Sequence, residues 1–379
     1  MTTDRGAFGF EIDFLPVGNG EDSGDSICMR WGYGLNTNSP EQFVVVVDGG
    51  YSKTGEEVVE HIKKYYFRDG LLPLNVDVVI STHPHQDHIS GIMPIFKGVN
   101  KVKWLIMHTP WHHDGLKAWF DSNGKLKETT IQNKLRTGLS DALELEVQAK
   151  AKGTMVVEAF SPWASKEFCG CSFDILSPSK KFYEALLPDF NATPGHGFVD
   201  RGKRLKPTGR RVASFSCPLD GNGETSAENE SSIVLLIKII PKDRYVLLTA
   251  DSGKLALANV AKYIIDNQLD VNKIDIFQVP HHGSIQNLSP ELLNVFLGFC
   301  KKEPCRTFTR TAVVSVSDKA DEDHPSDAVR NAILERGVGF CATQGGIKRF
   351  WYGDVPARMG YTDIEYDNRP SATVREFVV

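Results

Sequence analysis

The chain has 379 residues, of which 41% are hydrophobic and 24% charged, and its formal net charge is −5. This composition excludes a largely disordered chain and lacks the basic excess typical of nucleic-acid-binding domains. No window approaches the roughly 18 consecutive apolar residues of a transmembrane span, and residues 1–9 lack the apolar core of a signal peptide. Seven cysteines, an odd number in a long chain, favour reduced thiols. We therefore expect a cytoplasmic protein with no membrane partner.

The first half of the chain alternates predicted strands with two predicted helices. The helix at 53–67 has Val58, Val59, Ile62 and Tyr66 on one face. A second helix at 128–152 shows the same helical spacing of apolar residues and is expected to cover a sheet. Strands are expected at 10–17, 26–31, 43–47, 76–80, 102–107, 155–160 and 172–176.

The second half continues the alternation. Strands are expected at 232–240, 245–249, 274–279 and 311–316, and helices at 252–266, from 290 onward and at 325–335. The strands at 232–240 and 245–249 predict a hairpin. Those at 339–343 and 347–351 predict a closing hairpin around residues 344–346. No linker divides the chain, so we expect a single domain over residues 1–379.

Residues 178–228 lack clear periodicity and are rich in proline, glycine and basic residues, which is typical of a long functional loop. The basic cluster consists of Arg201, Lys203, Arg204, Lys206, Arg210 and Arg211. Most charge runs are solvated surface. This one precedes a strand that we expect at the edge of the candidate site described below. We therefore predict that Arg201, Lys203, Arg204, Arg210 and Arg211 help to hold an anionic substrate, with solvated surface as the alternative.

Four potential metal ligands crowd into six residues directly after the predicted strand at 76–80. They are His83, His85, Asp87 and His88, in the pattern H-x-H-x-D-H. Imidazole nitrogens and carboxylate oxygens are ligands that borderline divalent ions such as Zn²⁺ prefer. A lone surface histidine is usually inert, but four such groups in one tight loop indicate metal binding. Alternation predicts His83 and His85 on one ion, with Asp87 and His88 facing a second.

Two later segments end in the same kind of residue. Residues 245–251 form an apolar strand that ends in Asp251, and residues 276–282 form one that ends in His281 and His282. Open α/β sheets place their chemistry where strands end. An aspartate after a strand is also a common turn former, whereas a pair of histidines there is more specific. Taken together, the three segments predict one metal centre.

This order of ligands resembles that of the metallo-β-lactamase superfamily. Within it, the chain is similar to the hydrolase domain of the DNA-uptake competence protein ComEC and its soluble relatives. The likeness runs from about residue 10 to about residue 352. The segments that carry it, besides the H-x-H-x-D-H motif, are residues 14–20, 25–27, 45–50, 229–235, 280–284 and 324–325.

The resemblance, together with the order of elements, implies an α/β fold. We expect an αβ/βα four-layer sandwich of two mixed sheets covered by helices. The resemblance also implies a metal-dependent hydrolase with two divalent ions, Zn²⁺ or else Mn²⁺, and a bridging hydroxide. His83 and His85 would hold the first ion. Asp87, His88 and one of His281 or His282 would hold the second, and Asp251 would bridge both.

Further residues receive expected roles around the two ions. Asp87 is expected to serve in catalysis as well as in metal binding. The histidine of the 281–282 pair that is not on metal would donate a proton to the leaving oxygen or bind its phosphate. In the catalytic set we place His281, and also His324, for which a plain loop histidine is the alternative.

Two more residues lie at the border of the predicted site. Asp48 is expected to orient a ligand histidine through its other ring nitrogen, with a simple Asp-Gly-Gly turn as the competing interpretation. Many relatives of the wider superfamily carry a third histidine for the first ion where this chain has Asn229 or its neighbours. We expect Asn229 to contact the substrate.

The substrate class is open at this point. A phosphodiester in nucleic acid or a nucleotide is favoured by the basic cluster and the ComEC likeness, although the acidic net charge counts against it. The alternatives are hydrolysis of a lactone, a β-lactam or another ester, because one metal site serves many substrates. A non-catalytic binding protein that retains the fold is the third possibility.

Overall fold

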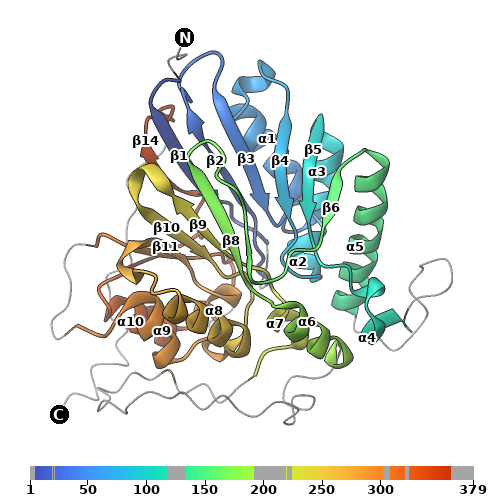
Figure 1. The fold of residues 1–379 in the computed structure, drawn as a ribbon, viewed down its shortest axis with the longest axis vertical. Helices are drawn as coiled ribbons and strands as arrows, with labels where there is room; N and C mark the ends of the chain where they lie inside the picture. The colour runs from blue at the N-terminus through green and yellow to red at the C-terminus, as the bar shows by residue number, and fades with distance from the viewer. Residues whose placement is uncertain are drawn as a thin grey trace.

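Two seven-stranded mixed sheets pack face to face, with helices on both outer sides (Figure 1). The computed structural model describes residues 5–18, 20, 22–117, 119, 133–191, 219, 224–301, 308–320 and 324–359. The arrangement is the predicted αβ/βα sandwich, and the predicted fold class is confirmed. Within these residues, no helix is long and apolar enough to cross a membrane.

The first sheet has the strand order β14-β1-β2-β3-β4-β5-β6. Its strands are β1 (Phe8–Phe14), β2 (Ile27–Tyr33), β3 (Glu41–Val47), β4 (Asn75–Ile80), β5 (Lys101–Ile106), β6 (Met155–Val157) and β14 (Lys348–Gly353). Pairing is antiparallel from β14 to β3 and parallel from β3 to β6. The carboxyl ends of β3 and β4 therefore meet at one edge.

The second sheet has the order β13-β12-β11-β10-β9-β8-β7. Its strands are β7 (Trp163–Ala164), β8 (Cys171–Ser177), β9 (Val234–Ile239), β10 (Arg244–Leu248), β11 (Ile274–Gln278), β12 (Thr311–Val314) and β13 (Gly339–Ala342). Pairing is antiparallel from β7 to β10 and parallel from β10 to β13. The second sheet thus repeats the pairing pattern of the first.

The space between the sheets is filled by alternate residues of the strands. In β1, Phe10, Ile12 and Phe14 face this inner core, whereas Glu11 and Asp13 belong to the opposite face, because successive side chains of a strand alternate. From the second sheet, β8, β9 and β10 supply residues such as Ile175, Leu235 and Val246. Burial of these apolar side chains holds the two sheets together.

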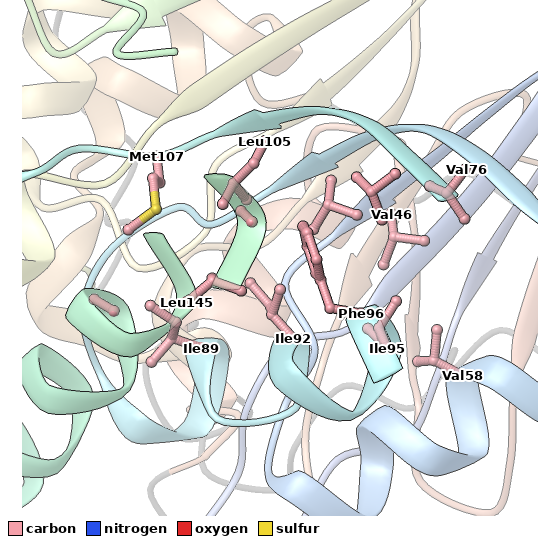
Figure 2. Close-up of a cluster of buried hydrophobic side chains, with 14 of the residues drawn as sticks. Val46, Val58, Val76, Ile89, Ile92, Ile95, Phe96, Leu105, Met107 and Leu145 are labelled. Carbon is pink, nitrogen blue, oxygen red and sulfur yellow. The ribbon is translucent and has the colours of Figure 1, made fainter. Parts of the chain in front are cut away.

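Helices cover the outer face of each sheet. On the first sheet lie α1 (Ser52–Tyr65), α3 (Ile92–Gly98) and α5 (Asn133–Ala151). Figure 2 shows their apolar side chains, among them Val58, Ile92 and Phe96, packed against Val46 and Leu105 of the strands. On the second sheet lie α8 (Lys254–Asp266), α9 (Pro290–Leu297) and α10 (Asp327–Leu334). The four short helices are α2 (Gln86–Ile89), α4 (Asp114–Lys117), α6 (Lys180–Leu186) and α7 (Ala227–Glu230).

The predicted hairpin at 232–249 is present as β9 and β10, but the predicted closing hairpin is wrong. β13 pairs with β12 in the second sheet, whereas β14 crosses to the first sheet and pairs with β1. Arg349 of β14 donates to the buried Glu11 of β1, with 2.8 Å between Nε and Oε2. The free edge of β1 and this buried charge pair favour the crossing over a local hairpin.

The segment at 178–228 contains one helix and the start of another, because α6 lies within it and α7 begins at its end. Residues 192–218 and 220–223 are outside the described residues, and the basic cluster falls among them. The structure therefore leaves the role of Arg201, Lys203, Arg204, Arg210 and Arg211 as a prediction.

Candidate metal centre

The predicted ligands converge at the edge where the two sheets meet. His83, His85, Asp87 and His88 follow β4 of the first sheet, Asp251 follows β10, and His281 and His282 follow β11 of the second sheet. Segments separated by about 200 residues thus supply one site. Strand order explains this, since β4 and β11 occupy equivalent places beside the strands at which pairing changes from antiparallel to parallel.

One group of potential ligands consists of Asp87, His88, Asp251 and His282, whose ligand atoms all lie within 4.8 Å of one another. His88 Nε2 is 3.4 Å from Asp251 Oδ2 and 3.9 Å from Asp87 Oδ2. His282 Nε2 is 3.8 Å from both Asp87 Oδ2 and Asp251 Oδ1. Ligand atoms around one ion at about 2 Å are expected 3–4 Å apart, so this group fits a divalent ion. The geometry groups His282, not His281, with these residues.

A second group consists of His83, His85 and Asp251, again within 4.8 Å of one another. His83 Nε2 lies 3.7 Å from Asp251 Oδ2, and the rings of His83 and His85 are 4.7 Å apart. Asp251 therefore belongs to both groups. A carboxylate has two oxygens, so Asp251 is placed to serve two ions at once.

The buried atoms at the centre test whether these residues fit cations. Within the described part of the chain, no hydrogen-bond partner reaches His83 Nε2, His88 Nε2, His282 Nε2 or Asp251 Oδ1, although all four atoms are buried. Buried polar groups are nearly always satisfied, and unpartnered ones are destabilising. Three imidazole nitrogens and a carboxylate oxygen facing one another are the donor set of a transition-metal site. The residues present fit divalent cations.

Hydrogen bonds on the far side of each ring set its orientation. His88 Nδ1 donates to Asp48 Oδ2 over 2.8 Å, and His282 Nδ1 donates to the backbone oxygen of Ser315 over 2.9 Å. Thr82 Oγ1 donates to Asp48 Oδ2 over 2.6 Å and so accepts from His83 Nδ1, 3.1 Å away. With the proton on Nδ1, each neutral ring turns the lone pair of Nε2 to the centre.

Asp48 lies beneath the loop, and its two oxygens accept three hydrogen bonds. Besides those from His88 and the Thr82 hydroxyl, the Thr82 amide donates to Oδ1 over 2.8 Å. Asp48 has a φ of +55°, in the left-handed region that non-glycine residues rarely occupy. This backbone conformation brings the carboxylate under the H-x-H-x-D-H loop.

Asp25 and Gln278 are site residues whose roles the sequence did not reveal. Gln278 Nε2 donates to Asp25 Oδ2 over 2.8 Å, and Gln278 Oε1 accepts from the amides of Thr249 and Ala250. Asp25 Oδ2 is also 3.9 Å from His88 Nδ1. The pair thus ties the strand end that carries Asp251 to the loop that carries His88. Asp25 follows a glycine turn, which is the one local signal that could have indicated it.

Asn229 and His281 lie next to each other, and His281 Nε2 is 3.7 Å from Asp251 Oδ2. Asn229, at the end of α7 rather than in a strand, donates from Nδ2 to Thr225 Oγ1 over 2.8 Å and lies 3.3 Å from His281 Nε2. The ring of His324 is 6.2 Å from that of His281. The expected role of His281 in proton donation stays a prediction.

Opposing charges set the protonation of the metal-free centre. Burial lowers the pKa of His88, but Asp251 and Asp48 outweigh it and raise that pKa well above its usual value. Burial also opposes the charged form of His282, yet Asp251 and Asp87 raise its pKa to about 9. For His83, burial and the neighbouring histidines His88 and His85 hold the pKa well below its usual range. Burial alone would raise the pKa of Asp251. The surrounding histidines have the larger effect and hold that pKa well below its usual value.

Part of the chain is similar to a known protein family. Residues 39–207 match the sequence model of the metallo-beta-lactamase superfamily. Similar solved structures include Zn²⁺-bound PqqB from Methylobacterium extorquens, with 10% identity, 90% of this chain and 99% of that chain covered, and a TM-score of 0.42. A diphosphatase from the PhnP family has 12% identity, coverages of 90% and 97%, and a TM-score of 0.38. A metallo-beta-lactamase with a HARLDQ motif from Cronobacter sakazakii has 12% identity, coverages of 70% and 73%, and a TM-score of 0.31.

No curated protein matches the chain. The family match is limited to residues 39–207, and the two mixed sheets and the paired ligand groups are consistent with it. The superfamily usually binds divalent metals, and the ligand groups described above are this chain's candidates for holding them.

Asp251→Ala should remove most of both metal ions, because this carboxylate belongs to both ligand groups. Metal analysis of the purified variant by mass spectrometry checks this, with circular dichroism to confirm that the variant is folded. Asp266→Ala, at the exposed end of α8, is the matched control and should keep its metal. Full metal content in Asp251→Ala would show that the residue does not bridge.

Metal affinity should fall as the pH is lowered below about 9. The pKa of His282 is raised to about 9 in the metal-free centre, and that of His88 is also raised. An ion must displace these protons, so affinity should rise about tenfold per pH unit for each proton released, and the contribution of His282 should level off above pH 9. Chelator competition between pH 6 and pH 9 measures the affinity. Calorimetry in buffers of different ionisation enthalpy counts the released protons, and a count of zero would contradict the expectation.

Proposed function

We propose that the protein is a metal-dependent phosphodiesterase that acts on nucleic acid or a nucleotide. The observation that carries the proposal is the membership of Asp251 in two adjacent ligand groups, which is the arrangement that a pair of close cations requires. Two bound cations supply activation of a water molecule and neutralisation of charge on the attacked centre. We take the ions to be Zn²⁺, with Mn²⁺ as the alternative, and the protein to act in the cytoplasm.

In this proposal some residues are metal ligands and others orient those ligands. His83 and His85 would hold the first ion, and Asp87, His88 and His282 would hold the second, with Asp251 available to both. Asp48, Thr82 and Ser315 keep the ligand rings turned inward through their outer nitrogens. Rigid ligands of this kind need little rearrangement during reaction.

Asn229 and His324 form the polar surroundings of the first group in this proposal. The Nδ2 group of Asn229 is a donor, suited to an oxygen of an anionic substrate. His324 lies beside His281 and is our candidate for donating a proton to the leaving oxygen. No serine nucleophile is required for this chemistry.

A phosphodiester is favoured because two cations neutralise a phosphate as well as activate water. The basic cluster at residues 201–211 adds positive charge to a chain that is acidic overall. The similarity of the motifs to the hydrolase domain of ComEC points to the same class of substrate. Esters, lactones and β-lactams are the competing substrates, and they offer less negative charge to such a cluster than a nucleic acid does.

A substrate panel combined with metal analysis tests the proposal. The panel contains bis-p-nitrophenyl phosphate, single- and double-stranded DNA, RNA, a cyclic dinucleotide, a lactone and a β-lactam. We expect metal-dependent cleavage of at least one phosphodiester and none of the lactone or lactam. Cleavage confined to the lactone or lactam by metal-loaded protein would reject a phosphodiester substrate. Inactivity on the whole panel would argue for a binding protein.

His83→Ala and His88→Ala should each lower phosphodiester hydrolysis by about a thousandfold or more. The metal centre generates the nucleophile, so loss of a ligand removes the reaction rather than weakening substrate binding. Steady-state kinetics measure the effect, and thermal melting shows whether the fold is kept. His112→Ala, an exposed histidine paired with Glu146, is the control and should stay active. Turnover near the wild-type value in either ligand variant would sink the hydrolase interpretation.

Neutralising the basic cluster should weaken capture of a long substrate without changing the chemistry. Replacing Arg201, Lys203, Arg204, Arg210 and Arg211 by glutamine should raise KM for single-stranded DNA and flatten its salt dependence, because fewer counterions are released on binding. Hydrolysis of bis-p-nitrophenyl phosphate should change little, since that substrate is too small to reach a separate basic surface.

A matched control replaces Lys63, Lys242 and Lys262 by glutamine, which lowers the charge on the outer helices and on a turn instead. This control should leave both KM and its salt dependence near the wild-type values. Equal behaviour of the cluster variant and the wild type at low salt would identify the cluster as solvated surface.

A further inference from the structure

The end of α7 and the residues after it contact all three segments that carry the predicted ligands. Asn229 Nδ2 lies 3.3 Å from His281 Nε2, in the loop after β11. The amide of Ile233 donates to the backbone oxygen of Thr82, in the loop after β4, over 3.0 Å. Between these two contacts, Glu230 reaches the start of α8, which follows β10. One short stretch of chain thus touches every ligand-bearing segment.

Glu230 is buried, and both of its carboxylate oxygens accept backbone amides at the start of α8. The Leu255 amide donates to Oε1 over 3.1 Å, and the Ala256 amide donates to Oε2 over 2.7 Å. These are the second and third residues of the helix, and the first amides of a helix have no partner within it. A protonated carboxyl group uses one oxygen as a donor, so accepting an amide at each oxygen requires the ionised form.

Glu230 occupies the place of a local helix cap. Gly253 is the N-cap of α8 and gives the helix no side-chain cap of its own. A Cβ atom at Gly253 would lie only 2.2 Å from Glu230 Oε1 and 2.4 Å from Thr225 Cγ2. A serine at position 253 would cap the start of α8 equally well, so capping alone does not require a carboxylate from α7. The added effect of the distant cap is a link between α7 and the turn that carries Asp251.

The turn of Asp251 is held on its other side by β11 and the loop after it. Gln278 Oε1 accepts from the amide of Ala250 over 3.0 Å. Asn287 Nδ2 donates to the backbone oxygen of Asp251, also over 3.0 Å. Glu230 supplies the corresponding contact on the α7 side, so the turn lies between two supports.

We propose that Glu230 is a positioning residue that fixes the carboxylate of Asp251 relative to the two histidine loops. The inference rests on the proposed two-metal function and names a residue that acts on its centre without being a ligand. Glu230 acts through the start of α8 and the turn before it. Because Asp251 belongs to both ligand groups, release of this turn should weaken the binding of both ions together.

The charge of Glu230 should make this support depend on pH. Burial raises the pKa of Glu230 to about 7, and the amides of Ala256 and Leu255 oppose that rise. Of the charged groups around it, Glu224 ahead of α7 raises the pKa and Lys254 at the start of α8 lowers it. The ionised form prevails above pH 7 and is lost as the pH falls through that value. The support should therefore weaken below pH 7.

Zn²⁺ competition with a chromogenic chelator, on the full-length apoprotein, tests the assignment without an activity measurement. Glu230→Gln keeps the size of the side chain but has one acceptor oxygen. At pH 8.5 it should weaken both binding constants of the wild type by about tenfold to a hundredfold. The ratio of wild-type to variant constants should shrink by about fivefold to tenfold between pH 8.5 and pH 6, because a protonated Glu230 supports the turn no better than glutamine does. Protons on the ligand histidines are common to both proteins and cancel in this ratio.

Two further proteins separate positioning from folding, and thermal melting accompanies each. Glu228→Gln, on the same short helix, is the matched control and should keep both constants, because Glu228 accepts from the Asn191 amide rather than from α8. The triple variant Glu230→Ala, Gly253→Ser, Thr225→Ser replaces the distant cap by a local one and removes the methyl group that would obstruct it. Its thermal midpoint should exceed that of Glu230→Ala by a few degrees, whereas both of its metal-binding constants should stay weak.

Three results would overturn the proposal. The first is equal constants at pH 8.5 in a folded Glu230→Gln protein, and the second is a wild-type-to-variant ratio that does not change with pH. The third is recovery of both constants in the triple variant, which would reduce Glu230 to an ordinary helix cap. Failure of the two-metal function is distinct, because the wild type itself would then show fewer than two binding constants.

Discussion

The site depends on a buried carboxylate that faces imidazole nitrogens for which the described part of the chain offers no hydrogen-bond partner. Asp251 lies with the inward-facing Nε2 atoms of His83, His88 and His282 at the meeting edge of the sheets. Burying a charge without compensation is destabilising by several kcal/mol. Protons on His88 and His282 compensate part of it in the metal-free protein, and a pair of cations would compensate it more fully. The outer hydrogen bonds to Asp48, Thr82 and Ser315 are the means by which the fold keeps these rings in place.

The repeated pairing pattern of the two sheets explains why this edge can be built at all. β3 and β10 each pair antiparallel on one side and parallel on the other. Asp48 follows β3 and Asp251 follows β10, while the histidine loops follow the neighbouring strands β4 and β11. Each half of the chain thus contributes one carboxylate and one histidine loop. The two carboxylates have different roles. Asp48 accepts hydrogen bonds from the outer side of the site, whereas Asp251 faces the inner Nε2 atoms of the histidines.

The elements that carry the site could be predicted because their signals are local. Buried strands that end in histidine or aspartate place those groups at a sheet edge whatever the rest of the chain does. Where an observed strand ends a few residues from its predicted end, the cause is also local. The strand predicted at 10–17 ends at Phe14, because Pro16 offers no N–H to a ladder and restricts the residue before it.

The pairing of distant strands and the contacts between distant side chains could not be predicted in this way. The turn at residues 344–346 is suited to a hairpin and to a crossing between sheets, and the choice depends on the distant β1, through its free edge and its Glu11. The supporting residues were hidden for the same reason. Gln278 and Asp25 are 253 positions apart, and nothing in their local sequence shows that they meet. Asn287 is an ordinary polar residue until its amide is seen against the loop of Asp251.

Strained backbone is concentrated where the ligands leave the strands. Asp48, Ala250, His281 and His282 all have positive φ, at a cost of about 1–2 kcal/mol each. The surrounding contacts oppose this cost, since the Ala250 amide donates to Gln278 and the Ala250 oxygen accepts from the His281 amide. The same contacts connect the strand end of Asp251 to the histidine pair. The amide of Asn287 adds a further link, since it donates to the backbone oxygens of Asp251 and Ser252. Ala250 and Asn287 thus join the histidine pair to the strand end that carries the shared carboxylate of the two ligand groups.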